Sequence, residues 1–275
     1  MLRLNDIHAG YEGAAVLRGV SLTFGPGILT AVVGPNGGGK STLLRVAAGL
    51  MKPTLGAVHW GERDLAMLPV AERARRLAFV SQRPVAPIDF SVREVVRLGR
   101  FAVARTSRDE HVDDALQSMK LLELAASAMG TLSVGQQQRV AVARGLAQLD
   151  GGAADHRPPS MLLADEPVAA MDPAQALSTM SVLKGLAARG HGVVVVLHDL
   201  SLAARFADRL VVLVGGSVLA SGDTAEVLAA DSLEQAFGTA FVRVVGGGRT
   251  IGVVAGTGAD ALGTHLAGFD YDSPP

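Results

Sequence analysis

Apolar residues recur along the chain in two spacings, which together predict an alternation of strands and helices. Short aliphatic runs predict buried strands at 28–33, 161–164 and 193–197, because each run is too short for a helix. Apolar residues at helical spacing predict helices at 92–98 and 109–125. The chain is therefore expected to adopt an α/β fold.

Antiparallel strand pairs are predicted towards both ends of the chain. Residues 2–8 and 16–24 predict two strands of an antiparallel edge, with a turn between them. Residues 209–220 predict a hairpin with a two-glycine turn. One or two short helices are expected at 223–237, followed by a second hairpin at 241–254.

Three longer segments show no strand pattern. Between 83 and 131, after a loop with Pro84 and Pro87, the patterns are helical, so we expect an inserted helical lobe. Residues 150–159 are polar and rich in Gly and Pro, which predicts a loop. Residues 256–275 are rich in Gly, Asp and Pro and are expected to be partly disordered.

Composition narrows the class of protein. The 275 residues are 49% hydrophobic and 19% charged, which is typical of a globular chain. The net charge of -1, without a long Lys/Arg run, does not favour a nucleic-acid partner or an anionic membrane patch. The chain has no Cys, which excludes disulfides and thiolate metal sites. Without a visible signal segment or an apolar run near the roughly 18 residues that span a bilayer, we expect a soluble cytoplasmic protein.

A phosphate-binding loop follows the strand at 28–33. It matches G-x-x-x-x-G-K-[ST] without a gap, and a helical pattern follows it. Its main-chain N–H groups and the helix N-terminus can hold phosphate oxygens. Lys40 adds a cation for the β- and γ-phosphates, and the Ser41 hydroxyl is a ligand for Mg²⁺. The loop residues are Gly34, Pro35, Asn36, Gly37, Gly38, Gly39, Lys40 and Ser41. The alternative, a glycine-rich turn that precedes Lys-Ser by chance, does not account for the strand and helix that flank it.

A pair of acids ends the strand at 161–164. Asp165 and Glu166 stand where the apolar run stops, and Pro167 follows them. Buried charges need a partner, and Mg²⁺ on a phosphate is the natural one for Asp165. Glu166 is expected to point the other way and to accept a proton from an attacking water. The alternative is that both acids are ordinary solvated loop residues. The presence of a phosphate-binding loop in the same chain favours a metal ligand and a base instead.

Other polar residues near strand ends are ambiguous by themselves. Gln82 follows a short strand and His198 follows the strand at 193–197, and each residue type is more often structural there. Either could reach phosphate if its strand lies beside the loop, because ligands sit at strand carboxyl ends in α/β sheets. Tyr11, in the first turn, fits turn packing or the stacking of a base. Ser133 is a suitable N-cap for the helix after it.

Together and in this order, these elements resemble the ATP-binding subunits of ABC transporters over roughly residues 2–240. The fold that the resemblance implies is a P-loop (RecA-like) core with an antiparallel β edge and an inserted all-helical subdomain. The matching elements are Tyr11 as the adenine-stacking aromatic, 34–42 as Walker A, Gln82 as the Q-loop glutamine, 132–136 as the L-S-G-G-Q signature, 161–166 as Walker B with its catalytic glutamate, and His198 as the switch histidine.

The resemblance implies Mg²⁺-dependent ATP hydrolysis. Lys40, Gln82, Glu166 and His198 are the expected catalytic residues. Mg²⁺ is expected on Ser41, Gln82 and Asp165. The expected nucleotide-binding residues are Tyr11, the loop from Gly34 to Ser41, Thr42 and, from a second copy of the chain, Ser133, Gly135 and Gln136.

The sequence departs from the family pattern at several positions. Val134 stands where the signature usually has glycine, and its bulk is expected to weaken closure of the dimer, while activity is expected to survive because Ser133 and Gly135 are kept. Ala169 replaces a serine and cannot make that hydrogen bond. Gly38, where alanine is common, is expected to be harmless.

The resemblance also implies domains and partners. We expect an ATPase domain at 1–240, with its core at 1–82 and 156–240 and a helical subdomain at 83–155, and a partly flexible C-terminal extension at 241–275. The expected partners are a second copy in an ATP-sandwich homodimer, membrane permease subunits and, indirectly, a periplasmic substrate-binding protein, with no nucleic acid. The chain is then expected at the cytoplasmic face of the inner membrane, held there by the permease.

The cargo is predicted from resemblance alone. Residues 92–100 and 218–228 are similar to importers of ferric siderophores, vitamin B12 and heme, and the insertion at 150–159 is similar to that of heme (hemin) importers. Heme is therefore the first expectation. The rivals are a soluble ABC ATPase in DNA repair or translation, a P-loop kinase, and a regulatory module that binds ATP without hydrolysis.

Overall fold

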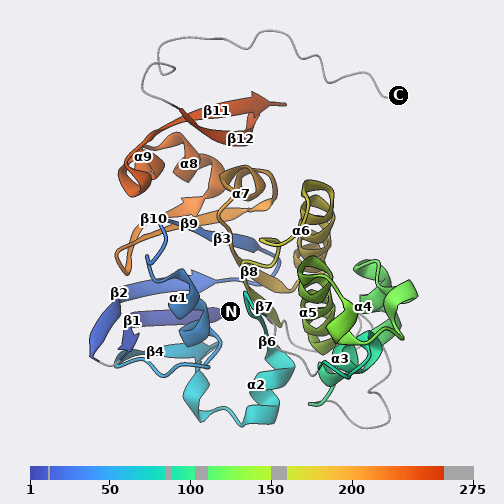
Figure 1. Ribbon diagram of the computed structural model, residues 1–275. Helices are drawn as coiled ribbons and strands as arrows, with labels where there is room; N and C mark the ends of the chain where they lie inside the picture. The colour runs from blue at the N-terminus through green and yellow to red at the C-terminus, as the bar shows by residue number, and fades with distance from the viewer. Residues whose placement is uncertain (12, 84–87, 103–110, 150–159, 257–275) are drawn as a thin grey trace.

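A six-stranded sheet forms the centre of the molecule, in the strand order β10-β9-β3-β8-β7-β6 (Figure 1). The computed structural model describes residues 1–11, 13–83, 88–102, 111–149 and 160–256. All neighbouring strands of this sheet are parallel except β9 and β10, so the predicted α/β class is confirmed. The strands are β3 (Leu29–Val33), β6 (Leu77–Val80), β7 (Met161–Asp165), β8 (Gly192–Val196), β9 (Arg209–Val214) and β10 (Ser217–Asp223).

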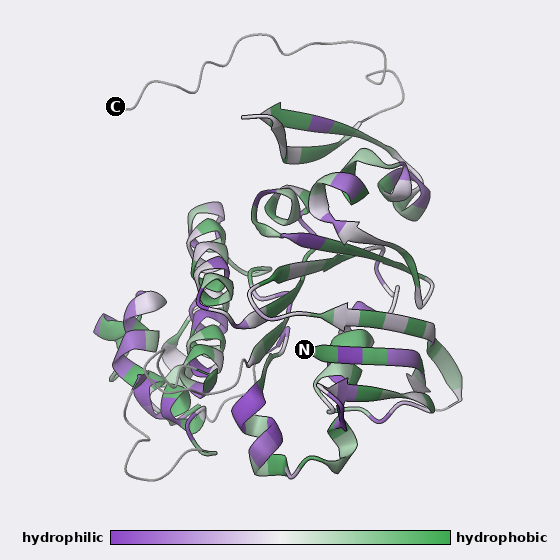
Figure 2. Cartoon of the chain, turned by 180° about the vertical axis from the view of Figure 1, so that it is seen from behind, coloured by the Kyte–Doolittle hydropathy of each residue, from purple (hydrophilic) through white to green (hydrophobic). Residues whose placement is uncertain are grey.

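Both faces of this sheet are covered, which explains why its strands are continuous apolar runs. Alternate residues of β3 point to opposite faces, so Ala31 packs in one core and Val32 in the other. One face carries α5 (Val134–Leu149) and α6 (Pro173–Ala188), and the other carries α1 (Lys40–Ala47). Figure 1 shows α1 on one side of the sheet and α5 and α6 on the other. Figure 2 shows the apolar residues gathered on the central strands.

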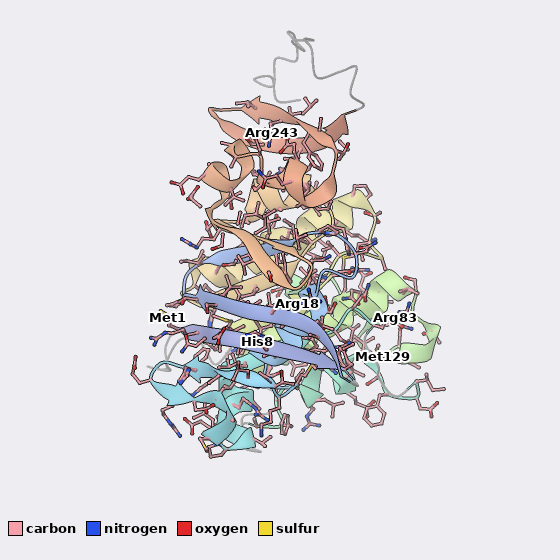
Figure 3. All side chains as sticks on the ribbon, turned by 90° about the vertical axis from the view of Figure 1, so that its left-hand side faces the viewer. Met1, His8, Arg18, Arg83, Met129 and Arg243 are labelled. Carbon is pink, nitrogen blue, oxygen red and sulfur yellow. The ribbon has the colours of Figure 1, made fainter. Side chains whose placement is uncertain are left out.

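A second, antiparallel sheet covers α1 from outside in the order β2-β1-β4-β5. It consists of β1 (Leu2–Tyr11), β2 (Ala14–Phe24), β4 (Leu55–Trp60) and β5 (Arg63–Asp64), with α2 (Val70–Arg76) leading from it to β6. The predicted antiparallel edge at 2–8 and 16–24 is confirmed, and both strands are longer than expected. Figure 3 labels Met1 just before the first strand, His8 on that strand and Arg18 on the second.

The helical part packs α3 (Val92–Leu98) and α4 (Val112–Ser118) against α5. The helix expected at 109–125 is wrong in length: it ends at Ser118 and is followed by a 3₁₀ turn at Leu122–Leu124. Lys120 takes a left-handed conformation with φ of 55°, and the Leu121 N–H donates to Leu116 O at 2.8 Å. This C-terminal cap buries Leu121, so the apolar spacing continues through a turn.

The C-terminal part contains α7 (Leu200–Phe206), α8 (Thr224–Ala229), α9 (Ser232–Phe237), β11 (Ala240–Gly246) and β12 (Arg249–Gly256). Both expected hairpins and the short helices at 223–237 are confirmed. Gly215 and Gly216 have φ of 55° and 84°, the conformation that a tight two-residue hairpin turn requires. The predicted loops at 84–87 and 150–159 and the tail at 257–275 lie outside the described residues.

The predicted domain boundaries stay a prediction. Helix α5 belongs to the expected helical subdomain, yet it contacts β6 and β7 of the central sheet as well as α3 and α4. Within the residues that the structure describes, no helix combines the length and the apolar character that crossing a bilayer requires.

The helix α6 supplies a test of how this core is held together. Leu183 on α6 is fully buried against the sheet, so Leu183→Ala should lower the free energy of unfolding by about 2–5 kcal/mol. Urea denaturation followed by circular dichroism measures this loss. Ser181→Ala, on the exposed side of the same helix, is the control and should stay within about 0.5 kcal/mol of wild type. Equal losses in the two variants would contradict the packing described here.

Candidate functional site

The phosphate loop joins β3 to α1 and contains several glycines with positive φ. Gly34, Gly37 and Gly39 have φ of 143°, 75° and 98°. A Cβ atom on Gly34 would lie 2.0 Å from Leu213 O, so no other residue fits there without moving β9. Turned in this way, the loop brings its main chain to the start of α1, where N–H groups are free of helical partners.

Lys40 is the first residue of α1 and is buried. Its ammonium donates to Gly34 O and Pro35 O, both at 2.8 Å. Burial lowers the pKa of Lys40, while the nearby carboxylates of Glu166 and Asp165 act in the opposite direction. The cation therefore lies against its own loop and next to both acids.

Asp165 and Ser41 meet beside this loop. Asp165 ends β7 and is only 2% exposed, and its Oδ1 accepts from the Ser41 hydroxyl at 3.1 Å. Burial raises the pKa of Asp165, and the hydrogen bond from Ser41 opposes this shift. A buried carboxylate beside a hydroxyl fits Mg²⁺, which prefers oxygen ligands. Among the described residues, no group of three or more His, Asp or Glu side chains is placed to hold a metal ion.

Glu166 is held between two other predicted residues. Its Oε1 lies 2.6 Å from His198 Nε2, and its Oε2 accepts from Gln82 Nε2 at 2.8 Å. The three side chains follow β7, β8 and β6, which are neighbours in the sheet and end at the same edge. Sequence reasoning expected Gln82 on the metal with Ser41 and Asp165. In the structure its amide nitrogen is on Glu166, so a role on Mg²⁺ stays a prediction.

Tyr11 lies at the end of β1, above α1, and is 46% exposed. Its hydroxyl accepts from Arg45 Nη1 at 3.1 Å. Hydrogen bonds from Thr42 and Arg45 lower the pKa of this phenol. The hydroxyl is thereby fixed to the helix that begins at the phosphate loop, and the exposed ring has room for a stacked base.

The segment 133–136 begins α5 with a reciprocal cap. The Ser133 N–H donates to Gln136 Oε1 at 2.8 Å, and the Gln136 N–H donates to Ser133 Oγ at 3.3 Å. A Cβ on Gly135 would lie 2.6 Å from Ala170 O, so glycine is required there. Val134 projects outward and is 67% exposed. The structure does not bring this segment to the phosphate loop of the same chain, because α5 and α1 lie on opposite faces of the sheet (Figure 1).

Glu166 and His198 also line a pocket that the sequence motifs do not predict. Its volume is about 590 Å³, and its walls come from the start of α6, from α7 and from Ile251 on β12. Its apolar members include Val168, Met171 and Leu202. Because these residues are scattered over more than one element and carry no recognisable chemistry, sequence reasoning missed the pocket.

Comparison with known proteins matches a family profile described as "ABC transporter" to residues 17–169. Among the similar curated proteins is the hemin import ATP-binding protein HmuV of Rhizobium meliloti, 38% identical over 240 residues, which cover 86% of this chain and 91% of that protein. The protein of the same name from Pseudomonas fluorescens is 40% identical and covers 86% of this chain and 92% of its own length.

Solved structures agree with this. The ATP-binding cassette MJ0796, a dimer in a post-hydrolysis state bound to ADP and Pi, is 31% identical, with a TM-score of 0.71 over 82% of this chain and 99% of that chain. An ATP-binding subunit of an ABC transporter is 27% identical, with a TM-score of 0.72 over 86% of this chain and 93% of that chain. These matches confirm the predicted fold of a P-loop core with an antiparallel edge and a helical subdomain.

Two loop glycines test whether close packing, rather than positive φ alone, shapes the loop. Gly34→Ala places a methyl group against Leu213 O, so we expect a large loss of stability and of ATP binding. Gly37→Ala meets nothing within 4 Å and should cost only the backbone strain, about 1–2 kcal/mol. Thermal denaturation and titration with a fluorescent ATP analogue measure both losses. Similar losses of stability in the two variants would be evidence against the packing constraint.

Proposed function

Because this chain belongs to the ATP-binding subunits of ABC transporters, we propose that it powers the import of heme across a membrane. The chain is the ATPase subunit of an importer of this family. Heme as the cargo, the roles of single residues and the partners are the proposal. The observation that carries the chemistry is the position of Glu166, held by Gln82 and His198 at the sheet edge where the phosphate loop also lies.

ATP binds along the loop and α1. The main-chain N–H groups of residues 34–39 hold the phosphate oxygens, and Lys40 exchanges its bonds to Gly34 O and Pro35 O for the β- and γ-phosphates. The Tyr11 ring stacks on adenine, and Thr42 supports the Tyr11 hydroxyl. Since Tyr11 is tied to α1, the base and the phosphates are placed by one helix.

Ser41, Asp165 and Gln82 would hold Mg²⁺, which would neutralise charge on the phosphates. The chemistry of the donors supports this: Asp165 is a buried carboxylate whose partner is the Ser41 hydroxyl. Gln82 donates from Nε2 to Glu166, and Oε1 of the same amide is the atom that would bind Mg²⁺.

Glu166 polarises the attacking water, and His198 holds the γ-phosphate. The 2.6 Å separation of Glu166 Oε1 and His198 Nε2 supports this arrangement. It places the carboxylate of the proposed base within hydrogen-bond distance of the imidazole that would hold the γ-phosphate. Lys40 and the loop N–H groups stabilise the charge that develops on the transferred phosphoryl group.

A second copy of the chain completes the site with Ser133, Gly135 and Gln136. In one chain these residues begin α5, on the other face of the sheet from the loop, so a partner has to supply them. The proposal is supported by the solved relative of this family that is dimeric in a post-hydrolysis state bound to ADP and Pi. Val134 is exposed at this surface, and its bulk weakens closure. Ala169 leaves one serine hydrogen bond unmade, while Asp172 caps α6 by accepting from the Gln175 N–H at 2.8 Å.

The cargo and membrane partners rest on similarity. The relatives named above are hemin import proteins, which supports heme; a ferric siderophore or vitamin B12 is the alternative. In this proposal the chain sits at the cytoplasmic face of the inner membrane, docked on permease subunits that receive cargo from a periplasmic binding protein.

Replacing the proposed base separates ATP binding from hydrolysis. Glu166→Gln should bind ATP and stay dimeric while turnover falls at least about a hundredfold, because the amide cannot take a proton. Phosphate release and size-exclusion chromatography with ATP measure the two effects. Glu226→Gln, an exposed acid on α8, is the control and should hydrolyse at the wild-type rate. Wild-type turnover in Glu166→Gln would remove Glu166 from this role.

The cargo is tested with the chain and its co-purifying permease in liposomes. ATP hydrolysis is compared with the periplasmic binding protein loaded with heme, loaded with a ferric siderophore, and empty. Stimulation by the heme-loaded protein alone supports heme import. Stimulation only by the siderophore-loaded form keeps the ATPase and overturns the heme assignment.

A further inference from the structure

The C-terminal hairpin β11–β12 is fastened to the helix that follows His198. The Ser201 hydroxyl, in the first turn of α7, accepts from the Val253 N–H at 3.0 Å and donates to Val253 O at 3.2 Å. Val253 is buried in the larger core beside α7. One hydroxyl thus bonds both main-chain groups of a strand residue that is 52 positions away in the sequence.

A second anchor fixes the other strand of the hairpin. Arg243 on β11 pairs with both carboxylate oxygens of Glu234 on α9, at 2.7 and 3.1 Å, and also donates to Ala230 O. Figure 3 labels Arg243 on this hairpin, above the C-terminal helices. An isolated two-stranded hairpin is only marginally stable, so these contacts hold β12 in place as a fixed support for α7.

The turn from His198 to Ser201 depends on two supports. On its N-terminal side, the Leu197 N–H donates to Val32 O at 3.1 Å, which ties the end of β8 to β3. On its C-terminal side, Asp199 Oδ1 accepts from the Ser201 N–H at 2.8 Å, and the Ser201 hydroxyl is the group bonded to β12. His198 therefore lies between a fixed strand and a serine that is fixed to the hairpin.

On one side, the turn from His198 to Ser201 faces a pocket and therefore has few packing contacts. His198, Asp199, Ser201 and Leu202 border the pocket of about 590 Å³, whose far wall includes Ile251 of β12. The His198 side chain is 45% exposed. A short helix that borders open space can shift more readily than one packed on all sides, so the hydrogen bonds to Val253 carry more of the constraint.

We propose that the hairpin of residues 240–256 positions His198 for hydrolysis, with Ser201 as the positioning residue. The proposal rests on the role of His198 at the γ-phosphate that is proposed above. Ser201 touches neither nucleotide nor Glu166 in this scheme; it acts through the turn that carries His198. The hairpin then has a function in turnover in addition to its contribution to the fold.

The test removes only the Ser201 hydroxyl in the full-length chain. Ser201→Ala should lower kcat for basal ATP hydrolysis by about three- to tenfold, the effect of losing hydrogen bonds that aim a catalytic group. The KM for ATP should stay at the wild-type value, since the loop and Tyr11 are untouched, whereas the melting temperature should fall by about 2–4 °C because two main-chain groups of Val253 lose their partner. Ser201→Thr, which keeps a hydroxyl, should restore kcat.

Matched variants separate positioning from general destabilisation. Ser181→Ala removes a helix serine whose hydroxyl bonds only Leu177 O in its own helix, and it should leave kcat unchanged. In a His198→Ala background, measured by release of labelled phosphate, Ser201→Ala should cause no further loss, because its effect passes through His198.

Several outcomes overturn the proposal. Wild-type kcat in Ser201→Ala overturns it, as does a loss that Ser201→Thr does not restore. A parallel fall in kcat and ATP affinity shows a merely structural role, and an undiminished loss in the His198→Ala background shows that Ser201 does not act through His198. Wild-type turnover in His198→Ala alone instead overturns the role of His198 in the proposed function. The assay measures basal ATP hydrolysis, so its result does not depend on which cargo the transporter carries.

Discussion

The structure of the site depends on a close approach of main chains that leaves no room for side chains. Gly34 and Gly38 pack against Leu213 O, with Cβ positions that would lie 2.0 and 3.1 Å from that oxygen. The Gly216 N–H donates to Gly38 O at 3.1 Å, and the Arg18 N–H donates to Gly216 O at 2.9 Å. The end of β9 and the glycine turn after it therefore fix the phosphate loop through main-chain contacts, and β2 in turn fixes that glycine turn. Because packing sets the loop shape, phosphate meets donors that are already oriented, which lowers the entropy cost of binding.

The same edge of the sheet holds an acid in an unusual backbone conformation. A residue before proline normally takes an extended conformation, yet Glu166, which precedes Pro167, has φ of 50°. A left-handed residue costs roughly 1–2 kcal/mol and persists only where its surroundings determine it. At Glu166, the hydrogen bonds of its carboxylate with Gln82 and His198 provide this constraint. The conformation turns Glu166 away from Asp165 and Ser41, so two adjacent acids serve two separate places.

Much of this site was predictable because its residues follow short apolar strands. Parallel strands end at one edge, so Gln82, Glu166 and His198 were expected to lie close together once their strands were recognised as neighbours. Periodicity could not show where apolar spacing passes through a turn. The helix expected at 109–125 therefore ends earlier than predicted, at Ser118, before the left-handed Lys120.

Contacts between distant parts of the chain were beyond the sequence for a different reason. The hydroxyl of Ser201 bonds the main chain of Val253, and main-chain groups have no residue identity that a motif could record. The pocket that Glu166 and His198 line likewise takes most of its walls from ordinary apolar residues of separate elements. Such features depend on tertiary packing, which local patterns do not encode.

The polar groups of the site already have partners within the chain, and this sets the energetics of nucleotide binding. Lys40 donates to two loop carbonyls, Ser41 to Asp165, and Gln82 to Glu166. Leaving the buried Lys40 and Asp165 unpaired would be costly, so the free protein gains stability from these internal bonds. Binding of ATP then exchanges bonds rather than adding them. The exchange is favourable for Lys40 because phosphate oxygens carry full negative charge, so each new bond joins two ions, whereas a bond to a loop carbonyl has only one charged partner. In the proposed function the γ-phosphate, which carries the largest share of that charge, is the group best able to release Lys40 from its loop.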